Sequence, residues 1–153
     1  MKIEEKISQR ELVLPVLPKQ SGNYLLAKQV GNLLYISGIT SKFNGVVQYK
    51  GKVGDSLTVD EGYEAARICA LNHLAVIESV VGDFNKVKQV VKLVGYVNCT
   101  ENFSDIPQVV NGASDLFIDL YGESGKHARC AVGVQSLPGN ASVETDLIVE
   151  LFE

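Results

Sequence analysis

The feature that most constrains this fold is a pair of segments whose apolar residues recur at three- and four-residue intervals. The first segment begins at Thr58-Val-Asp-Glu61, a capping box in which the Thr hydroxyl accepts from the N3 amide and Glu61 reaches back. Its apolar stripe consists of Val59, Tyr63, Ala66, Ala70, Leu74, Ile77 and Val81. Gly82 offers a C-terminal stop, so the pattern predicts a helix over 59–81.

The second segment begins at Asp105-Ile-Pro-Gln108, which supplies an N-cap and a proline that the first helical turn tolerates. Its stripe consists of Ile106, Val109, Val110, Ala113, Leu116, Phe117 and Leu120, and the pattern ends near Gly122. Each helix has one apolar stripe, so we expect both to lie on one face of a single sheet. The opposite face must then be solvated or covered by another subunit.

Short runs typical of β-strands surround the two helices. The first two flank Gly31-Asn32, a two-residue turn signal, and predict a hairpin. The runs span residues 24–30, 33–38, 46–53, 87–97, 128–135 and 142–152. The predicted order is therefore β-β-β-α-β-α-β-β, an α+β fold in a single domain over 1–153. Residues 1–21 show no clear period and contain Pro15 and Pro18, so we expect an irregular arm.

Composition excludes several classes of protein. The 153 residues suit one ordinary domain, and 46% apolar residues with a net charge of −4 exclude a disordered chain. No apolar run is long enough for a membrane helix, and the charged N-terminus lacks a signal peptide, so we expect a cytoplasmic protein without a membrane partner. The mild acidity argues against a nucleic-acid partner. Three widely spaced Cys and two distant His indicate neither a disulfide framework nor a metal site.

Alternation along the last two strands predicts which residues share a face. On the penultimate strand the apolar set of Cys130, Val132 and Val134 is expected to face the helices, with Arg129 facing away. Cys130 is accordingly predicted to be a buried thiol rather than a nucleophile.

On the last strand Val143, Thr145, Leu147, Val149 and Leu151 form the apolar set, so Glu144 is expected to face away as well. Arg129 and Glu144 are thus predicted to share the helix-free side, with Ala131 and Gly133 leaving space beside the cation. A guanidinium matches a carboxylate in a bidentate pair, so a small carboxylate ligand is one interpretation. The other is a surface Arg paired with an acid. Glu144 is likewise either a general acid or base or a solvated strand residue.

Two further side chains have open interpretations. His127 precedes Arg129 by two residues and shares its face if the strand extends that far, so it either contributes to an anion site or lies at an interface. Tyr24 is either a pocket residue or a packed aromatic side chain at a strand start.

Four stretches together resemble the Rid/YjgF family, also known as L-PSP endoribonucleases, over about 22–150. The matching stretches are Gly22-Asn-Tyr24, Gly31-Asn-Leu-Leu-Tyr-Ile-Ser-Gly38, the helix containing Asn111, and Ala128-Arg129 to Leu137-Pro138 followed by Val143-Glu144. The spacing of fifteen residues from Arg129 to Glu144 also agrees with the family.

The resemblance implies a chorismate-mutase-like α+β fold, a mixed sheet with two helices on one face, assembled as a homotrimer with its sites between subunits. It implies hydrolysis of reactive imines and enamines such as 2-aminoacrylate to a 2-keto acid and ammonia, with no cofactor. Arg129 would clamp the substrate carboxylate and Glu144 would position or activate the attacking water. Tyr24 and Asn111 would line the pocket, and Ser37-Gly38 would supply polar contacts.

The chain also departs from the family pattern. Asn23 stands where deaminases of the family usually have Pro, Cys130-Ala131 where they have Ser-Cys, and Gly133 where they have a larger residue. These departures motivate a second hypothesis, a non-catalytic trimeric module that binds a small carboxylate metabolite. RNA cleavage, implied by the family's other name, is a third.

Overall fold

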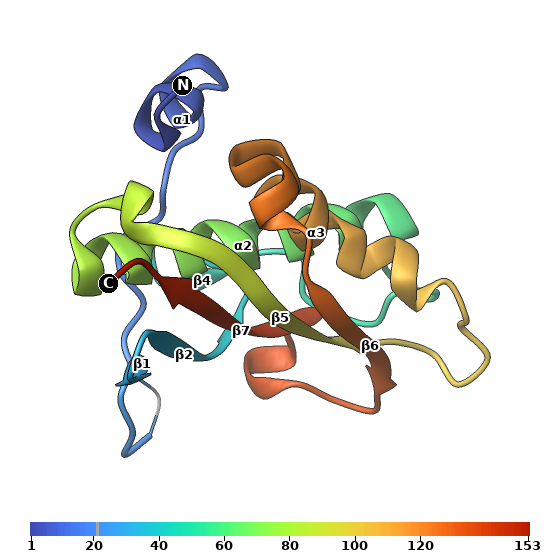
Figure 1. The fold of residues 1–153 in the computed structure, drawn as a ribbon. Helices are drawn as coiled ribbons and strands as arrows, with labels where there is room; N and C mark the ends of the chain where they lie inside the picture. Colours follow the sequence, from blue (N-terminus) through green and yellow to red (C-terminus); the bar gives the residue numbers. More distant parts are fainter. Residues whose placement is uncertain (21) are drawn as a thin grey trace.

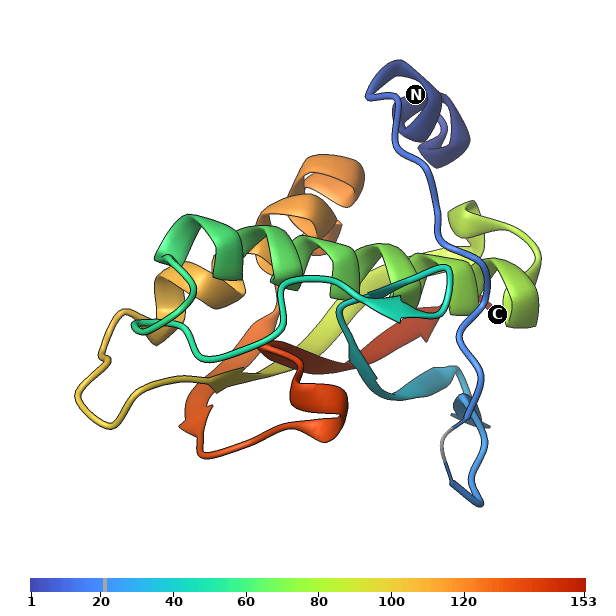
Figure 2. The same cartoon turned by 180° about the vertical axis from the view of Figure 1, so that it is seen from behind.

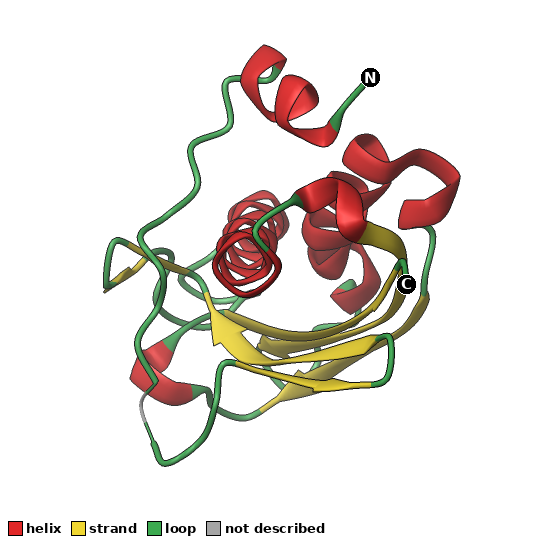
Figure 3. Ribbon diagram, turned by 60° about the vertical axis from the view of Figure 1, so that its left-hand side comes forward, coloured by secondary structure: helices red, strands yellow, loops and turns green. Residues whose placement is uncertain are grey.

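The two predicted helices are confirmed and cover one face of the sheet. The computed structural model describes residues 1–20 and 22–153. Helices α2 (Val59–Val81) and α3 (Ile106–Tyr121) pack side by side on the sheet (Figures 1 and 3). The amide of Glu61 donates to Thr58 Oγ1 over 3.2 Å, and Gly82 ends α2 in the left-handed conformation with φ +82°.

The main sheet is mixed and contains both parallel and antiparallel neighbours. Its order is β1-β2-β7-β5-β6, with β5 and β6 parallel and the other neighbours antiparallel. The parallel pair is joined through α3, as parallel strands require a crossover connection. The strands are β1 (Ala27–Val30), β2 (Leu33–Thr40), β5 (Val87–Asn98), β6 (Ala128–Val134) and β7 (Val143–Leu151).

Between the sheet and the helices lies the buried core. Leu93 on β5 and Leu147 on β7 pack beneath the helices, which contribute Leu74 and Phe117, and all four side chains are at most 1% exposed. Short 3₁₀ turns complete the chain at Phe84–Lys86, Gly122–Gly125 and Pro138–Asn140.

The weak run predicted at 46–53 forms only a short strand. β4 (Val46–Val47) pairs with β3 (Lys42–Phe43) in a separate two-stranded sheet. The backbone turns at Tyr49 and Gly51, which have φ +56° and +116°. Extended strands do not use positive φ, so no continuous strand forms here, and Lys50 and Val53 make only isolated bridges.

The prediction of an irregular arm is wrong at its start, because Ile3–Gln9 form the helix α1. Ile3 is buried, its amide donates to Asn85 Oδ1 over 3.2 Å, and Arg10 pairs with Asp119 of α3. Two helical turns are too short to show a period in the sequence, and α1 is held by these contacts with distant residues. Residues 12–20 are irregular and run from α1 down to the β1 edge of the sheet (Figure 2), and Ser21 lies outside the described residues.

The face predicted for β6 is also wrong. Arg129 pairs in register with the core residue Leu93, and Ala131 packs against the core. Cys130 and Val132 point to the opposite, helix-free face and are exposed. The reason is that β6 is an edge strand beneath a polar flank of α3, so its helix-facing side carries a cation rather than its apolar residues.

Helices α2 and α3 both lie on the other side of the sheet, so neither covers its helix-free face, called the open face below (Figure 3). It exposes Tyr35 on β2 and Val132 on β6, which are 41% and 38% accessible. Among the described residues, no helix has the length and apolar character needed to span a membrane.

Candidate functional site

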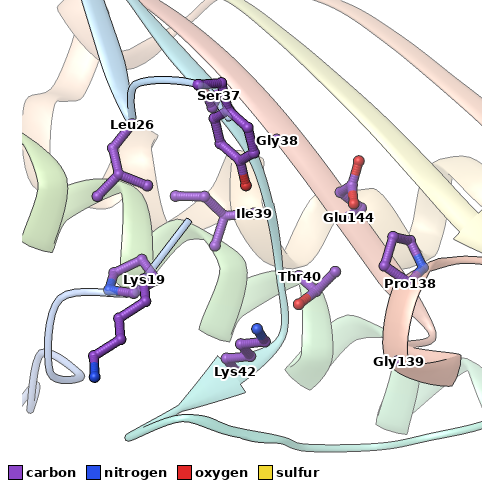
Figure 4. A pocket seen from close by; sticks show the side chains of 12 residues that line it. Lys19, Leu26, Ser37, Gly38, Ile39, Thr40, Lys42, Pro138, Gly139 and Glu144 are labelled. Carbon is purple, nitrogen blue, oxygen red and sulfur yellow. The ribbon is translucent and has the colours of Figure 1, made fainter. Parts of the chain in front are cut away.

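Four of the predicted site residues line one cavity, called the Glu144 cavity. Tyr24, Ser37, Gly38 and Glu144 border a space of about 530 Å³, together with Pro138 and Gly139 of the following 3₁₀ turn. Figure 4 shows Gly38 on β2 beside Glu144 on the neighbouring strand β7, with Ser37 one residue earlier on β2. The predicted grouping of these four residues around one space is therefore present within a single chain.

Glu144 is placed on the open face by the alternation of β7, as predicted. Its strand partner on β2 is Thr40, and its side chain is partly buried. Burial raises the pKa of the Glu144 carboxyl above its ordinary value, and the negative charge of Asp146 raises it further. A carboxylate with a raised pKa binds a proton more strongly, which suits a group that must accept one during a reaction.

The absence of a side chain at Gly38 leaves space for the Glu144 carboxylate. A Cβ atom at position 38 would lie 2.8 Å from Glu144 Oε2, closer than such contacts allow. The register between β2 and β7 shifts between Ile36 and Ile39, so Gly38 lies at an irregularity of the strand. The glycine at this point is thus explained by the neighbouring carboxylate.

Ser37 connects β2 to the segment that carries Tyr24. Its amide donates to Leu26 O over 2.9 Å, and its hydroxyl donates to Leu25 O over 2.6 Å. The hydroxyl proton is therefore used within the chain, while the hydroxyl oxygen can still accept a hydrogen bond. Ser37 fixes the backbone just after Tyr24 and so helps to place this aromatic side chain at the cavity.

Arg129 and Asn111 form a second group, called the Arg129 cluster, with Ser114 and His127. Arg129 Nη1 donates to Asn111 Oδ1 over 2.7 Å and to Ser114 Oγ over 3.2 Å. His127 Nδ1 lies 2.7 Å from Gly125 O, so Nδ1 carries the proton and Nε2 accepts from the Ser114 hydroxyl at 2.9 Å. Burial lowers the pKa of His127, which favours this neutral form.

This network orients the guanidinium and leaves part of it available. Both hydrogen bonds of Arg129 use Nη1, and no acid among the described residues lies within ion-pair distance. Nε and Nη2 form the edge that matches a carboxylate in bidentate geometry. The Arg129 cluster thus leaves a guanidinium edge whose donors match the geometry of a small anion.

The two groups do not meet within one chain, which corrects the prediction that Arg129 and Glu144 share a face. Strand β5 lies between their strands, so the strands are separated by roughly 10 Å. In register, Arg129 aligns with Leu93 and Glu144 with Tyr96, three residues further along β5. The side chains also point to opposite faces of the sheet, so one small ligand cannot contact both.

Two lysines that line the Glu144 cavity were not predicted from the sequence as site residues. Lys19 comes from the N-terminal arm and Lys42 from β3, and both line the cavity. The place of Lys42 near the cavity could have been inferred from its position in the sequence, because it lies two residues beyond Thr40, the strand partner of Glu144. The place of Lys19 could not, because nothing local indicates where an irregular arm packs. The described side chains include no group of three His, Cys, Asp or Glu that could hold a metal ion.

Comparison with known proteins places these features in context. The family profile described as "YjgF/chorismate mutase-like, putative endoribonuclease" matches residues 4–151. The chain is 44% identical over 139 residues to "Protein TCP17" of Trypanosoma cruzi, covering 90% of this chain and 87% of the relative. It is 32% identical over 143 residues to a "2-iminobutanoate/2-iminopropanoate deaminase" of Dermatophagoides farinae, covering 92% and 94%.

Among solved structures, the chain is similar to the protein Atu1372 of Agrobacterium tumefaciens, whose function is described as unknown. The TM-score is 0.92 at 41% identity, covering 98% of this chain and 92% of the other. The N-terminal helix is therefore included in a fold that another chain shares almost completely.

Proposed function

The chain belongs to the Rid/YjgF family, and from this premise we propose that it hydrolyses small reactive 2-imino and enamine acids to 2-keto acids and ammonia. The observation that carries the proposal is the Glu144 cavity, in which a carboxylate of raised pKa lies against Gly38 and borders an open space. The name of the mite relative, an iminobutanoate and iminopropanoate deaminase, supports the same class of substrate.

We further propose that a complete site needs two copies of the chain, arranged in a homotrimer. The Arg129 cluster has a free guanidinium edge and the Glu144 cavity has a candidate base, yet the two lie on opposite faces of one sheet. A second copy that brings its Arg129 cluster to the Glu144 cavity supplies the missing carboxylate clamp. The exposed Tyr35 and Val132 of the open face give the copies an apolar surface to bury.

The reaction then follows from the residues in two steps. Arg129 holds the substrate carboxylate, and Glu144 takes a proton from water while the water oxygen bonds to the imine carbon. The proton passes to the imine nitrogen and gives a carbinolamine. In the second step Glu144 moves the carbinolamine hydroxyl proton to nitrogen, the C–N bond breaks, and ammonia leaves the 2-keto acid.

The test is hydrolysis of 2-aminoacrylate produced by a dehydratase, followed as pyruvate formed above the spontaneous rate. Glu144→Gln should lower kcat/KM by about 10²–10⁴-fold, the range for loss of a general base. Glu150→Gln is the matched control, because Glu150 lies on the same strand and face but outside the Glu144 cavity. No acceleration by the wild-type protein with this or related imines would contradict the proposal.

A non-catalytic binding module is the second candidate, favoured by Ala131, which stands where family deaminases have a cysteine. In that case 2-keto acids should raise the melting temperature of the wild-type protein but not of Arg129→Ala, with no turnover. RNA cleavage is the third candidate function. If Arg129→Ala cleaves RNA as well as the wild-type protein does, the cleavage comes from a contaminating nuclease or from another site.

A further inference from the structure

Lys42 places a cation on the same side of the sheet as Glu144. Thr40 pairs directly with Glu144, Lys42 begins β3 two residues later, and both residues line the Glu144 cavity. Figure 4 shows Lys42 and Thr40 at the end of the cavity away from Ser37. The carbonyl of Lys42 accepts from Asn72 Nδ2 over 2.7 Å, and Asn72 is buried in α2, so the backbone that carries the lysine is fixed.

The Lys42 ammonium forms no ion pair with any acid among the described residues. It makes neither a hydrogen bond nor an ion pair with any residue in the described part, although it is partly buried. Glu144 is the one acid among the residues that line the cavity. Lys19 adds a second positive charge at the rim, with its ammonium pointing away from Glu144 in Figure 4. A partly buried cation without a partner suits an anionic group of a ligand.

The spacing separates this cation from the reacting centre. Lys42 lies two residues beyond Thr40, the direct strand partner of Glu144, and extended chain rises about 3.3 Å per residue, so the Lys42 backbone is roughly 6–7 Å beyond that of Thr40. An anion bound at Lys42 therefore lies several ångströms from the imine carbon, which is attacked by the water molecule that Glu144 deprotonates. This anion is distinct from the substrate carboxylate next to the imine carbon. In the proposed function, the Arg129 cluster of the second copy holds that carboxylate.

We propose that the Glu144 cavity selects 2-imino acids that carry a second carboxylate at the far end of a short side chain, with Lys42 as the specificity-determining residue. This inference rests on the proposed function for the position of the first carboxylate. The ligand class itself follows from Lys42, Thr40 and Glu144 in one cavity.

The test compares two 2-keto acids that differ only at the distal end, 2-oxoglutarate and 2-oxopentanoate, which carry a carboxylate and a methyl group. Isothermal titration calorimetry of the wild-type protein should show about tenfold or tighter binding of 2-oxoglutarate, as expected for one charge-assisted hydrogen bond. Lys42→Gln should remove this preference and leave 2-oxopentanoate binding unchanged. Lys42→Arg should retain it, as should Lys50→Gln, which removes a nearby exposed lysine that does not line the cavity.

Equal affinity of the wild-type protein for the two acids, or failure to bind either at millimolar concentration, would overturn the inference. So would a loss of both affinities in Lys42→Gln, because Lys42 would then hold the first carboxylate. The assay needs no turnover. A Lys42-dependent preference without imine hydrolysis would reject the proposed function alone, and hydrolysis of monocarboxylate imines with no such preference would reject the inference alone.

Discussion

At the scale of single residues, Gly38 is the position where the smallest change should alter the site most. The added methyl group of Gly38→Ala would lie 2.8 Å from Glu144 Oε2, and this oxygen is the far end of a flexible side chain. We expect the carboxylate to move and the fold to persist. Hydrolysis of 2-aminoacrylate should fall by about tenfold or more, since small misplacements of a catalytic group are costly, while the melting temperature changes little.

A double-mutant cycle distinguishes displacement of Glu144 from a general disturbance of β2. If Gly38→Ala acts through the carboxylate, then adding it to Glu144→Gln should cause little further loss of kcat/KM. Independent, additive losses would show that the glycine serves the backbone of β2 and not the position of Glu144.

His73 should make the protein sensitive to acid. It is fully buried in α2, and its Nε2 lies 2.8 Å from Thr145 Oγ1 on β7, directly after Glu144. Burial lowers the pKa of His73 to about 3, so the folded protein keeps it neutral. The unfolded chain binds a proton near pH 6.5, so the free energy of unfolding should decrease by ~1.4 kcal/mol per pH unit as pH falls from about 6.5 toward 3.

Urea unfolding of the wild-type protein and His73→Gln between pH 4 and 7, a range of about three pH units, measures this dependence. The pKa values of Glu144 and Asp146 are raised by burial, which works in the opposite direction. The difference between the two proteins isolates the histidine. Parallel pH profiles for wild type and variant would contradict the assignment of acid sensitivity to His73.

At the scale of elements, the sequence correctly predicted the helix bounds and strand faces that depend on residues within the element itself. The capping box at Thr58 and the stripe that follows it define α2 almost to the residue, because both signals lie within the helix itself. On β7, alternation placed Glu144 correctly, because four apolar residues and Thr145 alternate along the strand and one arrangement buries them all. The cavity residues of β2 followed from the resemblance.

Strand β6 is the element whose face was predicted incorrectly from local alternation. Alternation sorts its residues into two sets but does not say which set faces the helices. The apolar set of Cys130 and Val132 was assigned to the core, yet α3 presents Asn111 and Ser114 above this edge strand and these bind Arg129. The correct face depends on a helix flank about fifteen residues away in sequence, and that contact is tertiary.

Helix α1 depends on tertiary contacts in the same way, and its apolar contacts should matter more than its ion pair. Ile3 is 7% exposed against the core, whereas Arg10 pairs with Asp119 at the surface. Ile3→Ala should lower the free energy of unfolding by about 2 kcal/mol, the lower part of the range for such truncations. Arg10→Ala should change it little, because solvent screens exposed pairs. Denaturant titration that ranks the two variants in the opposite order would refute this account of α1.

At the scale of the whole molecule, the one-sided arrangement of helices leaves the open face uncovered by helices, and the proposed trimer would bury it. Val132 lies on this face, points away from the Arg129 cluster and does not line the Glu144 cavity, because Tyr96 of β5 lies between Val132 and Glu144. A charge at the centre of an apolar contact is costly to bury, so Val132→Glu should shift the protein from trimer to monomer in light scattering after size exclusion. Wild-type protein that is monomeric at micromolar concentration would contradict a trimer formed through this face.

Mixing two inactive variants tests directly whether the site is shared between copies. Arg129→Ala keeps Glu144, and Glu144→Gln keeps Arg129, so each variant alone should be inactive toward 2-aminoacrylate. If each site combines one cluster with the cavity of a neighbour, random exchange of subunits restores both groups in about one quarter of the sites. The mixture should then recover about a quarter of wild-type activity per site, and the recovery should develop at the rate of subunit exchange. No recovery after complete exchange, verified with differently tagged subunits, would place both groups in one chain's site and reject the two-copy arrangement.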